Sequence, residues 1–211
     1  MRLPITVFIS GGGTTLRNLI ARRDRGELGV DIQLVVSSSA KAKGLEFAED
    51  AGIETLTVRK RDFTDETEYC DAMFNPVRLR GSELVVMAGF LQHVLIPPDY
   101  TNRVINIHPS LIPSFCGAGM YGGNVHSAVL EYGAKVSGCT VHFVDNQYDN
   151  GPIILQRTCP VLDNDTPEAL AARVFQQECI ALPEAIEAIG RGRVTCDGRK
   201  VAVREQEVSN E

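Results

Sequence analysis

The sequence predicts an α/β fold of the single-domain, Rossmann-like kind, with a mostly parallel, twisted sheet, helices on both faces and an antiparallel strand at one side. Two observations predict it. Short apolar runs of strand length recur along the chain, and amphipathic stretches of helix length separate them. The length of 211 residues is sufficient for one domain with a large buried core.

The first half of the chain alternates between the two kinds of segment. Apolar runs predict strands at residues 5–10, 32–37, 55–58, 84–88 and 104–108. Amphipathic stretches predict helices at residues 16–25, 43–51 and 65–80, with a short turn near residues 97–100. Strands that alternate with helices in this way are typical of parallel pairing.

The second half begins with a loop over residues 109–124 that is rich in Gly and Pro. A short helix is predicted after it, at residues 125–132. Strands follow at residues 137–144 and 153–158. Because these two strands are close in sequence, they are predicted to pair as antiparallel neighbours at one side of the sheet.

A long helix is predicted to begin at Thr166 and Pro167, because Pro suits the first helical position, and to run to about residue 188. The Asp-Gly pair at residues 197–198 predicts a hairpin between short strands on either side of it. The polar residues from Glu205 onward are expected to be disordered.

Charge and hydropathy limit the classes of partner. The net charge is −6, the pI is about 5.3 and the basic residues are dispersed, which argues against a nucleic-acid surface. The one short basic run, residues 59–61, is predicted to be a solvated turn. The apolar run at the N-terminus is too short to span a membrane. We expect small-molecule partners, with neither nucleic acid nor membrane among them.

The cysteines indicate the compartment. Six of them lie at wide, irregular spacings, with no Cys-x-x-Cys pair. This pattern favours reduced thiols over a zinc site or a disulfide framework. We therefore expect a cytoplasmic protein that contains no metal site. We further expect it to be a monomer or a homodimer.

The most informative segment is VINIHPSLIP, residues 104–113. Asn106 and His108 alternate with Ile107 and therefore point to the same side of the predicted strand. Pro109 ends the strand, so the pair lies at the carboxyl edge, where open α/β sheets bind ligands. An isolated His is more often a core residue with satisfied nitrogens, but the Asn two positions earlier favours a chemical role for His108.

A carboxylate is predicted to join this pair. Asp149 follows the strand-like TVHFV of residues 140–144, in the turn-forming sequence YDNGP. An amide, an imidazole and a carboxylate can together polarise a carbonyl, move a proton and orient the imidazole. The alternative is that Asp149 is an ordinary turn residue. His142, which alternates with Val141 and Phe143, is predicted to face solvent.

A glycine-rich turn joins the first predicted strand to the first predicted helix, with the sequence SGGGTTL at residues 10–16. Successive backbone N–H groups and a helix N-terminus could bind a phosphate there. Because the turn has no P-loop Lys and Leu16 replaces the third glycine of a dinucleotide motif, neither ATP nor NAD is supported. The alternative is a tight turn with no ligand.

Glu178 lies on the apolar stripe of the long helix, with Val174, Phe175 and Leu182. A carboxylate on a buried face requires a hydrogen-bond donor. A substrate hydroxyl, a backbone N–H or an Arg could each supply it.

Together these residues resemble the phosphoribosylglycinamide formyltransferase family over residues 5–192. The similar segments are SGGGTTLRN, VVMAGFLQHVL, INIHPSLIPSF, TVHFV, YDNGPIILQ and QQECIALP. INIHPSLIP marks a wider superfamily that also contains methionyl-tRNA formyltransferase and formyltetrahydrofolate deformylase. The glycine-rich turn and the short length favour the first family.

The resemblance implies one formyltransferase domain at residues 1–204, with a phosphate-binding half at 1–103 and a catalytic and folate-binding half at 104–204, before a tail at 205–211. It also implies roles for individual residues. The catalytic residues would be Asn106, His108 and Asp149. The phosphate and ribose of the substrate would contact Gly12, Gly13, Thr14, Thr15 and Glu178. The folate would contact Phe90, Leu91, Gln92, His93, Val94 and Asn106.

The implied reaction is transfer of a formyl group from 10-formyltetrahydrofolate, as co-substrate, to the amine of glycinamide ribonucleotide, without a metal. A hydrolytic alternative is a formyltetrahydrofolate deformylase. An alternative of another class is a non-catalytic nucleotide-sensing domain. The arginines that commonly contact the folate tail in this family appear here as Glu66 and Gln92.

Overall fold

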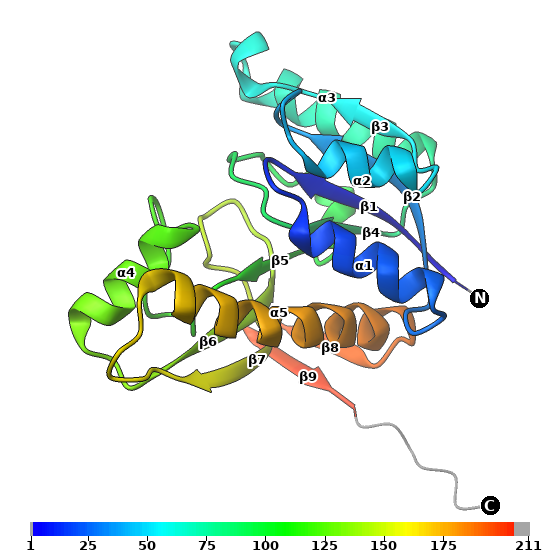
Figure 1. Cartoon of the computed structure of the whole chain (residues 1–211). Helices are drawn as coiled ribbons and strands as arrows, with labels where there is room; N and C mark the ends of the chain where they lie inside the picture. Colours follow the sequence, from blue (N-terminus) through cyan, green and yellow to red (C-terminus); the bar gives the residue numbers. More distant parts are fainter. Residues whose placement is uncertain (1, 205–211) are drawn as a thin grey trace, which may run out of the picture.

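The computed structural model describes residues 2–204 and contains a seven-stranded sheet of order β3-β2-β1-β4-β5-β6-β7 (Figure 1). The predicted disorder of residues 205–211 lies outside the described residues. The strands of the sheet are β1 (Leu3–Ile9), β2 (Val30–Ser37), β3 (Thr55–Thr57), β4 (Leu84–Met87), β5 (Val104–His108), β6 (Val136–Phe143) and β7 (Ile153–Pro160).

The pairing of the strands confirms the predicted fold class. Strands β1 to β5 are mutually parallel, whereas β6 runs antiparallel to β5 and β7 antiparallel to β6. The two antiparallel pairings lie together at one side of the sheet, as expected from the short connection between β6 and β7. All seven predicted strands are present, with ends that differ by a few residues from the prediction.

Five α-helices are described, together with two short 3₁₀ helices, η1 (Lys60–Asp62) and η2 (Pro98–Tyr100). The Asp65 carboxylate caps the N-terminus of one helix, because it accepts hydrogen bonds from the N–H groups of Thr67 and Glu68. The Thr166 hydroxyl begins the last helix by accepting the N–H of Ala169, and Pro167 occupies the predicted first position. The α-helices are α1 (Thr14–Asp24), α2 (Gly44–Asp50), α3 (Glu66–Leu79), α4 (Gly123–Tyr132) and α5 (Pro167–Gly190).

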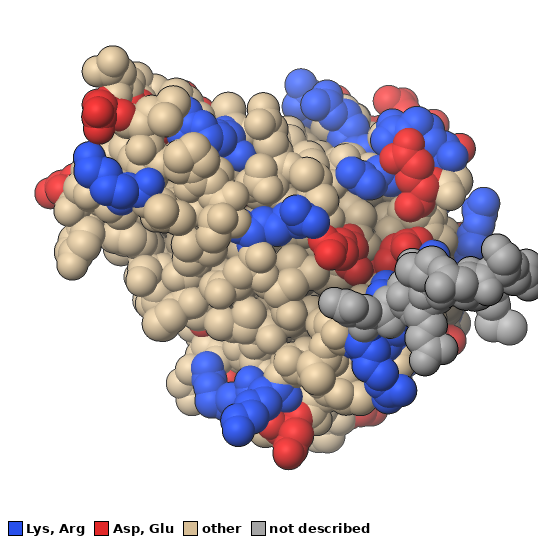
Figure 2. Space-filling view, turned by 90° about the horizontal axis from the view of Figure 1, so that it is seen from below, with Lys and Arg blue, Asp and Glu red and all other residues tan. Residues whose placement is uncertain are grey.

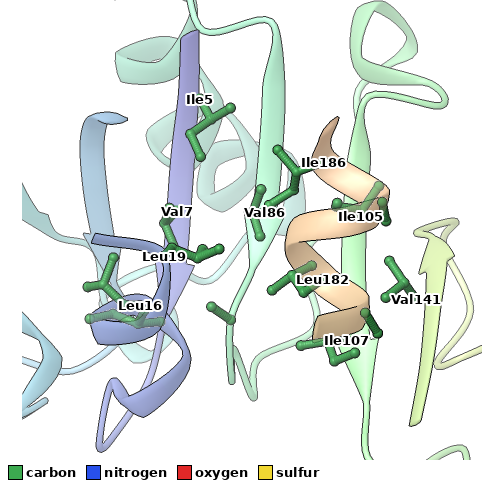
Figure 3. Close-up of a cluster of buried hydrophobic side chains, with 14 of the residues drawn as sticks. Ile5, Val7, Leu16, Leu19, Val86, Ile105, Ile107, Val141, Leu182 and Ile186 are labelled. Carbon is green, nitrogen blue, oxygen red and sulfur yellow. The ribbon is translucent and has the colours of Figure 1, made fainter. Parts of the chain in front are cut away.

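The helices cover both faces of the sheet. Residues at alternate positions of β1 face opposite ways: Ile5 and Val7 belong to the cluster beneath α1 and α5, whereas Phe8 packs with α3 on the other face. The ring centroids of Phe8 and Phe74 on α3 are 5.7 Å apart. Figure 3 shows side chains of α1 and α5 gathered over β1, β4, β5 and β6 in the first cluster. This three-layer packing fixes the positions of the strand ends.

The predicted hairpin is present as β8 (Val194–Asp197) and β9 (Lys200–Val203), which form a separate two-stranded sheet close to the end of the described residues. Among the described helices, none is long and apolar enough to cross a membrane. Figure 2 shows one face of the molecule, on which basic side chains lie in small separate groups, several of them beside acidic ones. This face therefore has no continuous basic surface.

The order of the strands reverses direction between β1 and β4, because β1 connects outward to β2 whereas β4 continues to β5. Ligands of doubly wound sheets bind at such a switch point, outside the carboxyl ends of the strands. The turns after β1, β4 and β5 meet at this edge. These turns and the elements that flank them contain most of the residues that the sequence predicts to be functional, whereas Asp149 comes from the loop between β6 and β7 and Glu178 from α5.

Candidate active site

A cavity of about 520 Å³ lies at the carboxyl edge of the sheet, and Asn106, His108 and Asp149 all line it. β5 places Asn106 and His108 on the same side of the strand, as their alternation predicts. The loop between β6 and β7 brings Asp149 to them, so that its Oδ2 is 3.5 Å from His108 Nδ1. The structure thus brings together the three residues that the sequence predicted to converge.

The His108 ring is buried and held at both nitrogens. Nε2 lies 2.9 Å from the backbone oxygen of Phe115, which also accepts the Ser110 hydroxyl at 3.2 Å. A carbonyl can only accept, so Nε2 carries a proton and donates it. Nδ1, the other nitrogen, faces the Asp149 carboxylate. A second proton on the ring would therefore lie at Nδ1, between the ring and the carboxylate.

Asp149 is held in place by its backbone and by a second loop. Its φ of 50° is in the left-handed region, which Asp tolerates better than most residues. Its Oδ2 also accepts the N–H of Gly117 at 2.9 Å. Because this bond joins the loop after β5 to the loop after β6, both loops fix the direction of the carboxylate.

His142 is a site residue that the sequence analysis missed, and the prediction that it faces solvent is wrong. It is 2% exposed, because β6 lies between β5 and β7. Its Nδ1 is 2.7 Å from the oxygen of Phe143, and its Nε2 is 3.2 Å from Asn106 Nδ2. The antiparallel register that pairs His142 with Asn106 is a tertiary feature without a local sequence signal.

The His142 ring orients the Asn106 amide. Burial lowers the pKa of the His142 imidazole, which favours the neutral ring. With the Nδ1 proton donated to Phe143, Nε2 is an acceptor and takes one hydrogen of the Asn106 amide. The second amide hydrogen remains for a ligand in the cavity that Asn106 lines.

His126, on α4, is a second residue that the sequence analysis missed. It is 4% exposed and lines the same cavity, and its Nδ1 has no partner within the described residues. Burial lowers the pKa of this imidazole, and the nearby His108 adds to the effect. A neutral ring with a free nitrogen therefore lies at the cavity wall. A helix is predicted at this position, but no local pattern in the sequence indicates the role of His126.

The glycine-rich turn follows β1, which is separated from β5 in the sheet by β4 alone, and the turn leads into the same cavity. Thr14 and Thr15, the first residues of α1, line the cavity, whereas Gly12 and Gly13 form the turn before them. α1 has no capping side chain and no acidic residue in its first turn. Its first N–H groups are therefore available to an anion.

The three glycines of the turn differ in what the fold requires of them. Gly13 has a φ of +70°, and a Cβ added there would collide with the backbone of Gly44 at the start of α2. Gly11 and Gly12 have ordinary φ values and no atom within 4 Å of an added Cβ. The fold therefore requires glycine at Gly13 but leaves open space beside Gly12.

Glu178 projects from α5 into the cavity, which Phe175 also lines. Its carboxyl receives no hydrogen bond from another side chain within the described residues, and burial raises its pKa to about 7. The sequence analysis considered three possible donors to this carboxyl: a substrate hydroxyl, a backbone N–H and an Arg. Within the described residues, no Arg bonds to it. The carboxyl is available to a ligand.

The predicted folate residues line two adjoining cavities. Phe90 lines both, Leu91 lines the large one, and Gln92, His93 and Val94 line a second cavity of about 70 Å³. Asn106, Tyr148 and Asp149 also line both cavities. A flat ring with polar edges suits this lining, because it combines the apolar Phe90 and Val94 with polar side chains such as Asn106 and Asp149.

An amide, an imidazole and a carboxylate at the edge of a doubly wound sheet, beside an anion-binding turn, define an α/β protein built for acyl-group chemistry. The chain belongs to the formyl transferase family, whose sequence profile matches residues 3–186.

Individual relatives agree with this assignment. A chloroplastic phosphoribosylglycinamide formyltransferase from Vigna unguiculata is 38% identical over 92% of the chain, and the chain spans 62% of the length of that protein. The structure of glycinamide ribonucleotide transformylase 1 from Symbiobacterium toebii matches with a TM-score of 0.89 and 38% identity, over 97% of this chain and 95% of the other. A formyltetrahydrofolate deformylase from Burkholderia mallei matches with a TM-score of 0.83 and 29% identity, over 97% of this chain and 71% of the other.

Proposed function

We propose that this chain transfers the formyl group of 10-formyltetrahydrofolate to the amine of N1-(5-phosphoribosyl)glycinamide, giving the N-formyl product and tetrahydrofolate in the biosynthesis of IMP. The observation that carries the proposal is one cavity that extends from the N-terminus of α1 to Asn106, His108 and Asp149. An acceptor whose phosphate lies at the first end can place its amine at the second. Similarity to proteins of that activity supports the same assignment.

The glycine-rich turn would hold the phosphate of the acceptor. The N–H groups of Gly12, Gly13, Thr14 and Thr15 and the positive end of the α1 dipole would face it. Glu178 would accept hydrogen bonds from the ribose hydroxyls. These hydroxyls would be the hydrogen-bond donors that the buried carboxyl requires and that no described side chain provides.

Asn106 and His108 would stabilise charge on the formyl oxygen. As the acceptor nitrogen bonds to the formyl carbon, the free amide hydrogen of Asn106 and a proton at His108 Nδ1 would donate to the developing oxyanion. The Nε2 proton stays with Phe115, whereas the 3.5 Å separation of Nδ1 from Asp149 leaves an Nδ1 proton for the ligand. His142 holds the amide in the donating orientation. Both donors are fixed before the reaction by bonds to other parts of the protein, so little reorganisation is required.

Asp149 would control the proton. Its carboxylate lies 3.5 Å from His108 Nδ1, where it would orient the ring and stabilise positive charge that develops on it during the transfer. One proton leaves the attacking amine and one reaches the departing nitrogen of the folate as its bond to the formyl carbon breaks. The Asp149 carboxylate and the His108 ring are placed to relay it.

The folate ring would lie in the second cavity, against Phe90, Leu91, Gln92, His93 and Val94, with its formyl group beside Asn106. The division into a phosphate-binding half at 1–103 and a folate-binding half at 104–204 remains a prediction. The cytoplasm is the proposed compartment, supported by the free cysteines.

The deformylase is the second candidate, because the deformylase of Burkholderia mallei shares the fold. The test is to incubate the purified chain with 10-formyltetrahydrofolate, with and without glycinamide ribonucleotide, and to measure tetrahydrofolate and formate. Transfer predicts tetrahydrofolate only when the acceptor is present, with no formate. Formate released at the same rate without the acceptor would establish the deformylase. If the chain binds the acceptor but forms neither tetrahydrofolate nor formate, the result would support the non-catalytic nucleotide-sensing domain.

Gly12→Ala is expected to raise the KM for the acceptor about tenfold while leaving the stability unchanged, because the added methyl occupies the open space proposed for the phosphate. Gly13→Ala serves as the contrast. Its methyl meets the backbone of Gly44, so it should lower the free energy of unfolding by about 2 kcal/mol. Steady-state kinetics and urea unfolding measure the two effects. An unchanged KM in Gly12→Ala would remove the phosphate from this turn.

Glu178→Gln is expected to change how stability depends on pH. Burial raises the pKa of Glu178 in the folded protein to about 7, above its unfolded value of 4.5. The proton bound to the folded state therefore stabilises it fully below pH 4.5, and this stabilisation is lost as the pH rises towards 7 and beyond. Relative to wild type, the Gln variant should gain about 3 kcal/mol between pH 4.5 and pH 8. Urea unfolding measures the free energy of unfolding of both proteins at pH 4.5 and pH 8. The same difference between the two proteins at both pH values would contradict this expectation.

His142→Phe is expected to lower kcat about tenfold, because Asn106 loses the acceptor that orients its amide. His142→Gln, whose amide oxygen can accept the same hydrogen, should recover part of the rate. Single-turnover kinetics with both variants make the comparison. Equal rates in the two variants would show that packing, not the hydrogen bond, is the contribution of His142.

A further inference from the structure

Phe115, whose carbonyl accepts the Nε2 proton of His108, has an unusual backbone conformation. Its φ is 51°, in the left-handed region that a bulky residue rarely adopts. Glycine would adopt this conformation without strain, but the Phe115 ring packs edge-on against Tyr132, with the ring centroids 5.7 Å apart. The loop after β5 therefore combines an anchored ring with a backbone that turns the carbonyl towards His108.

The Ser110 hydroxyl holds the same stretch of backbone. Ser110 is buried, and its Oγ lies 2.6 Å from the carbonyl oxygen of Ser114 and 3.2 Å from that of Phe115. A hydroxyl has one hydrogen to donate, and here it lies between two successive carbonyls. Without it, His108 would be the only side chain among the described residues that bonds to the Phe115 carbonyl.

Side chains of β6 and β7 anchor the start of this loop. The Thr140 hydroxyl donates to the backbone oxygen of Ser110 at 2.7 Å and accepts the N–H of Ile112 at 3.0 Å. The Gln156 amide donates to Thr140 Oγ1 at 2.9 Å and to the oxygen of Ile112 at 3.0 Å. Thr140 is buried and pairs with His108 in the register of β5 and β6. Ser110 is therefore fixed relative to the strand that carries His108.

Two acceptors compete for the single proton of a neutral His108 ring. The Phe115 carbonyl is 2.9 Å from Nε2, an ordinary hydrogen-bond distance, whereas the nearest Asp149 oxygen is 3.5 Å from Nδ1, which is longer than an ordinary bond. The hydrogen bond made by one ring nitrogen decides which tautomer is present. The shorter contact favours the proton at Nε2, but only while the loop holds the carbonyl in place. If the carbonyl turned away, the carboxylate would draw the proton to Nδ1.

We propose that Ser110 is a positioning residue, which acts through the Phe115 carbonyl to keep the proton of the neutral His108 ring at Nε2. Its consequence for turnover rests on the proposed function, whereas the position of the proton does not. With Nε2 protonated, the lone pair of the ring is at Nδ1, which faces Asp149. The proton that the attacking amine loses can then bond to Nδ1, and it leaves from there to the departing nitrogen of the folate. A ring with its single proton already at Nδ1 has no lone pair there to accept it.

The test follows the ring nitrogens of His108 by NMR, in protein whose four histidines are isotope-labelled. A protonated ring nitrogen and one with a lone pair resonate at well-separated frequencies, and the spectrum of His108→Gln identifies the His108 signals. Ser110→Ala removes the hydroxyl. Its matched control, Ser82→Ala, removes another buried hydroxyl, which is 2.8 Å from Thr6 Oγ1 and lines neither cavity. Spectra are recorded at a pH at which imidazoles are neutral.

We expect Nε2 to be the protonated nitrogen of His108 in the wild type and in Ser82→Ala. In Ser110→Ala the Nε2 and Nδ1 signals should move towards each other, because two tautomers then exchange. The kcat of Ser110→Ala should fall about tenfold, with little change in the KM of either substrate. A wild-type spectrum with the proton at Nδ1 would overturn the proposal. So would His108 signals in Ser110→Ala that equal those of wild type, whatever the kinetics.

Two further variants separate the hydroxyl from packing. Ser110→Thr keeps the hydroxyl and should return the His108 signals towards those of wild type, and signals like those of Ser110→Ala would overturn the proposal. If Ser110→Ala does not fold, Ser110→Cys replaces it, because its thiol is of similar size but is only a weak donor. The same movement of the signals is expected, and its absence would overturn the proposal. If the wild type transfers no formyl group, the proposed function fails, but the spectra still test the position of the proton.

Discussion

Asn106→Ala is expected to lower kcat for formyl transfer by a factor on the order of a hundred or more. The reason is that the Asn106 amide is a preorganised donor to the formyl oxygen, and loss of one such donor costs roughly 3 to 4 kcal/mol of barrier. The KM values should change little, because the donor acts mainly when charge develops. Rapid-quench kinetics at saturating substrates measure the effect.

The matched control for this variant is Asn75→Ala, which removes an exposed amide on α3, away from the described cavities. It should leave kcat unchanged. Urea unfolding of both proteins checks that they are folded. If Asn106→Ala retains the wild-type kcat while remaining folded, the amide has no part in stabilising the oxyanion.

Asp149→Asn is expected to produce the second large loss, a decrease in kcat of about a hundredfold or more, which is typical of lost general acid-base catalysis. The substitution keeps the size of the side chain and an oxygen that can accept the N–H of Gly117. It removes the negative charge beside His108 Nδ1. The rate should therefore fall without loss of the loop structure.

Two further measurements separate charge from structure at this position. Asp163→Asn removes an 89% exposed carboxylate elsewhere and should have no effect on kcat. The affinity of the acceptor for Asp149→Asn should stay near that of wild type, since Asp149 is not among the proposed phosphate or ribose contacts. A variant with normal kcat would exclude Asp149 from the proton relay.

Local patterns predicted the part of the site that lies on one strand. The alternation of Asn106 and His108 with Ile107, and the Pro that follows, were sufficient to place both side chains at the carboxyl edge. The fold class also followed from local information, because strand and helix periods differ and alternate along the chain. Asp149 could be proposed from its turn sequence, but its distance from His108 depends on how β6 and β7 pack.

The residues that the sequence analysis missed depend on pairing between distant segments. Alternation along 140–144 suggested that one side of this strand is solvated, whereas β6 lies inside the sheet and Ser137 to Phe143 are all buried. His142 therefore lies beside Asn106 on the neighbouring strand.

Asn106 and His108 are proposed to polarise the formyl oxygen of a bound folate. Difference infrared spectroscopy of 10-formyltetrahydrofolate with an isotope-labelled formyl carbon tests it without turnover, in the absence of the acceptor. We expect the formyl carbonyl stretch to lie at a lower frequency in the wild-type complex than in the Asn106→Ala complex. Equal frequencies in the two complexes, with the folate fully bound in both, would contradict it.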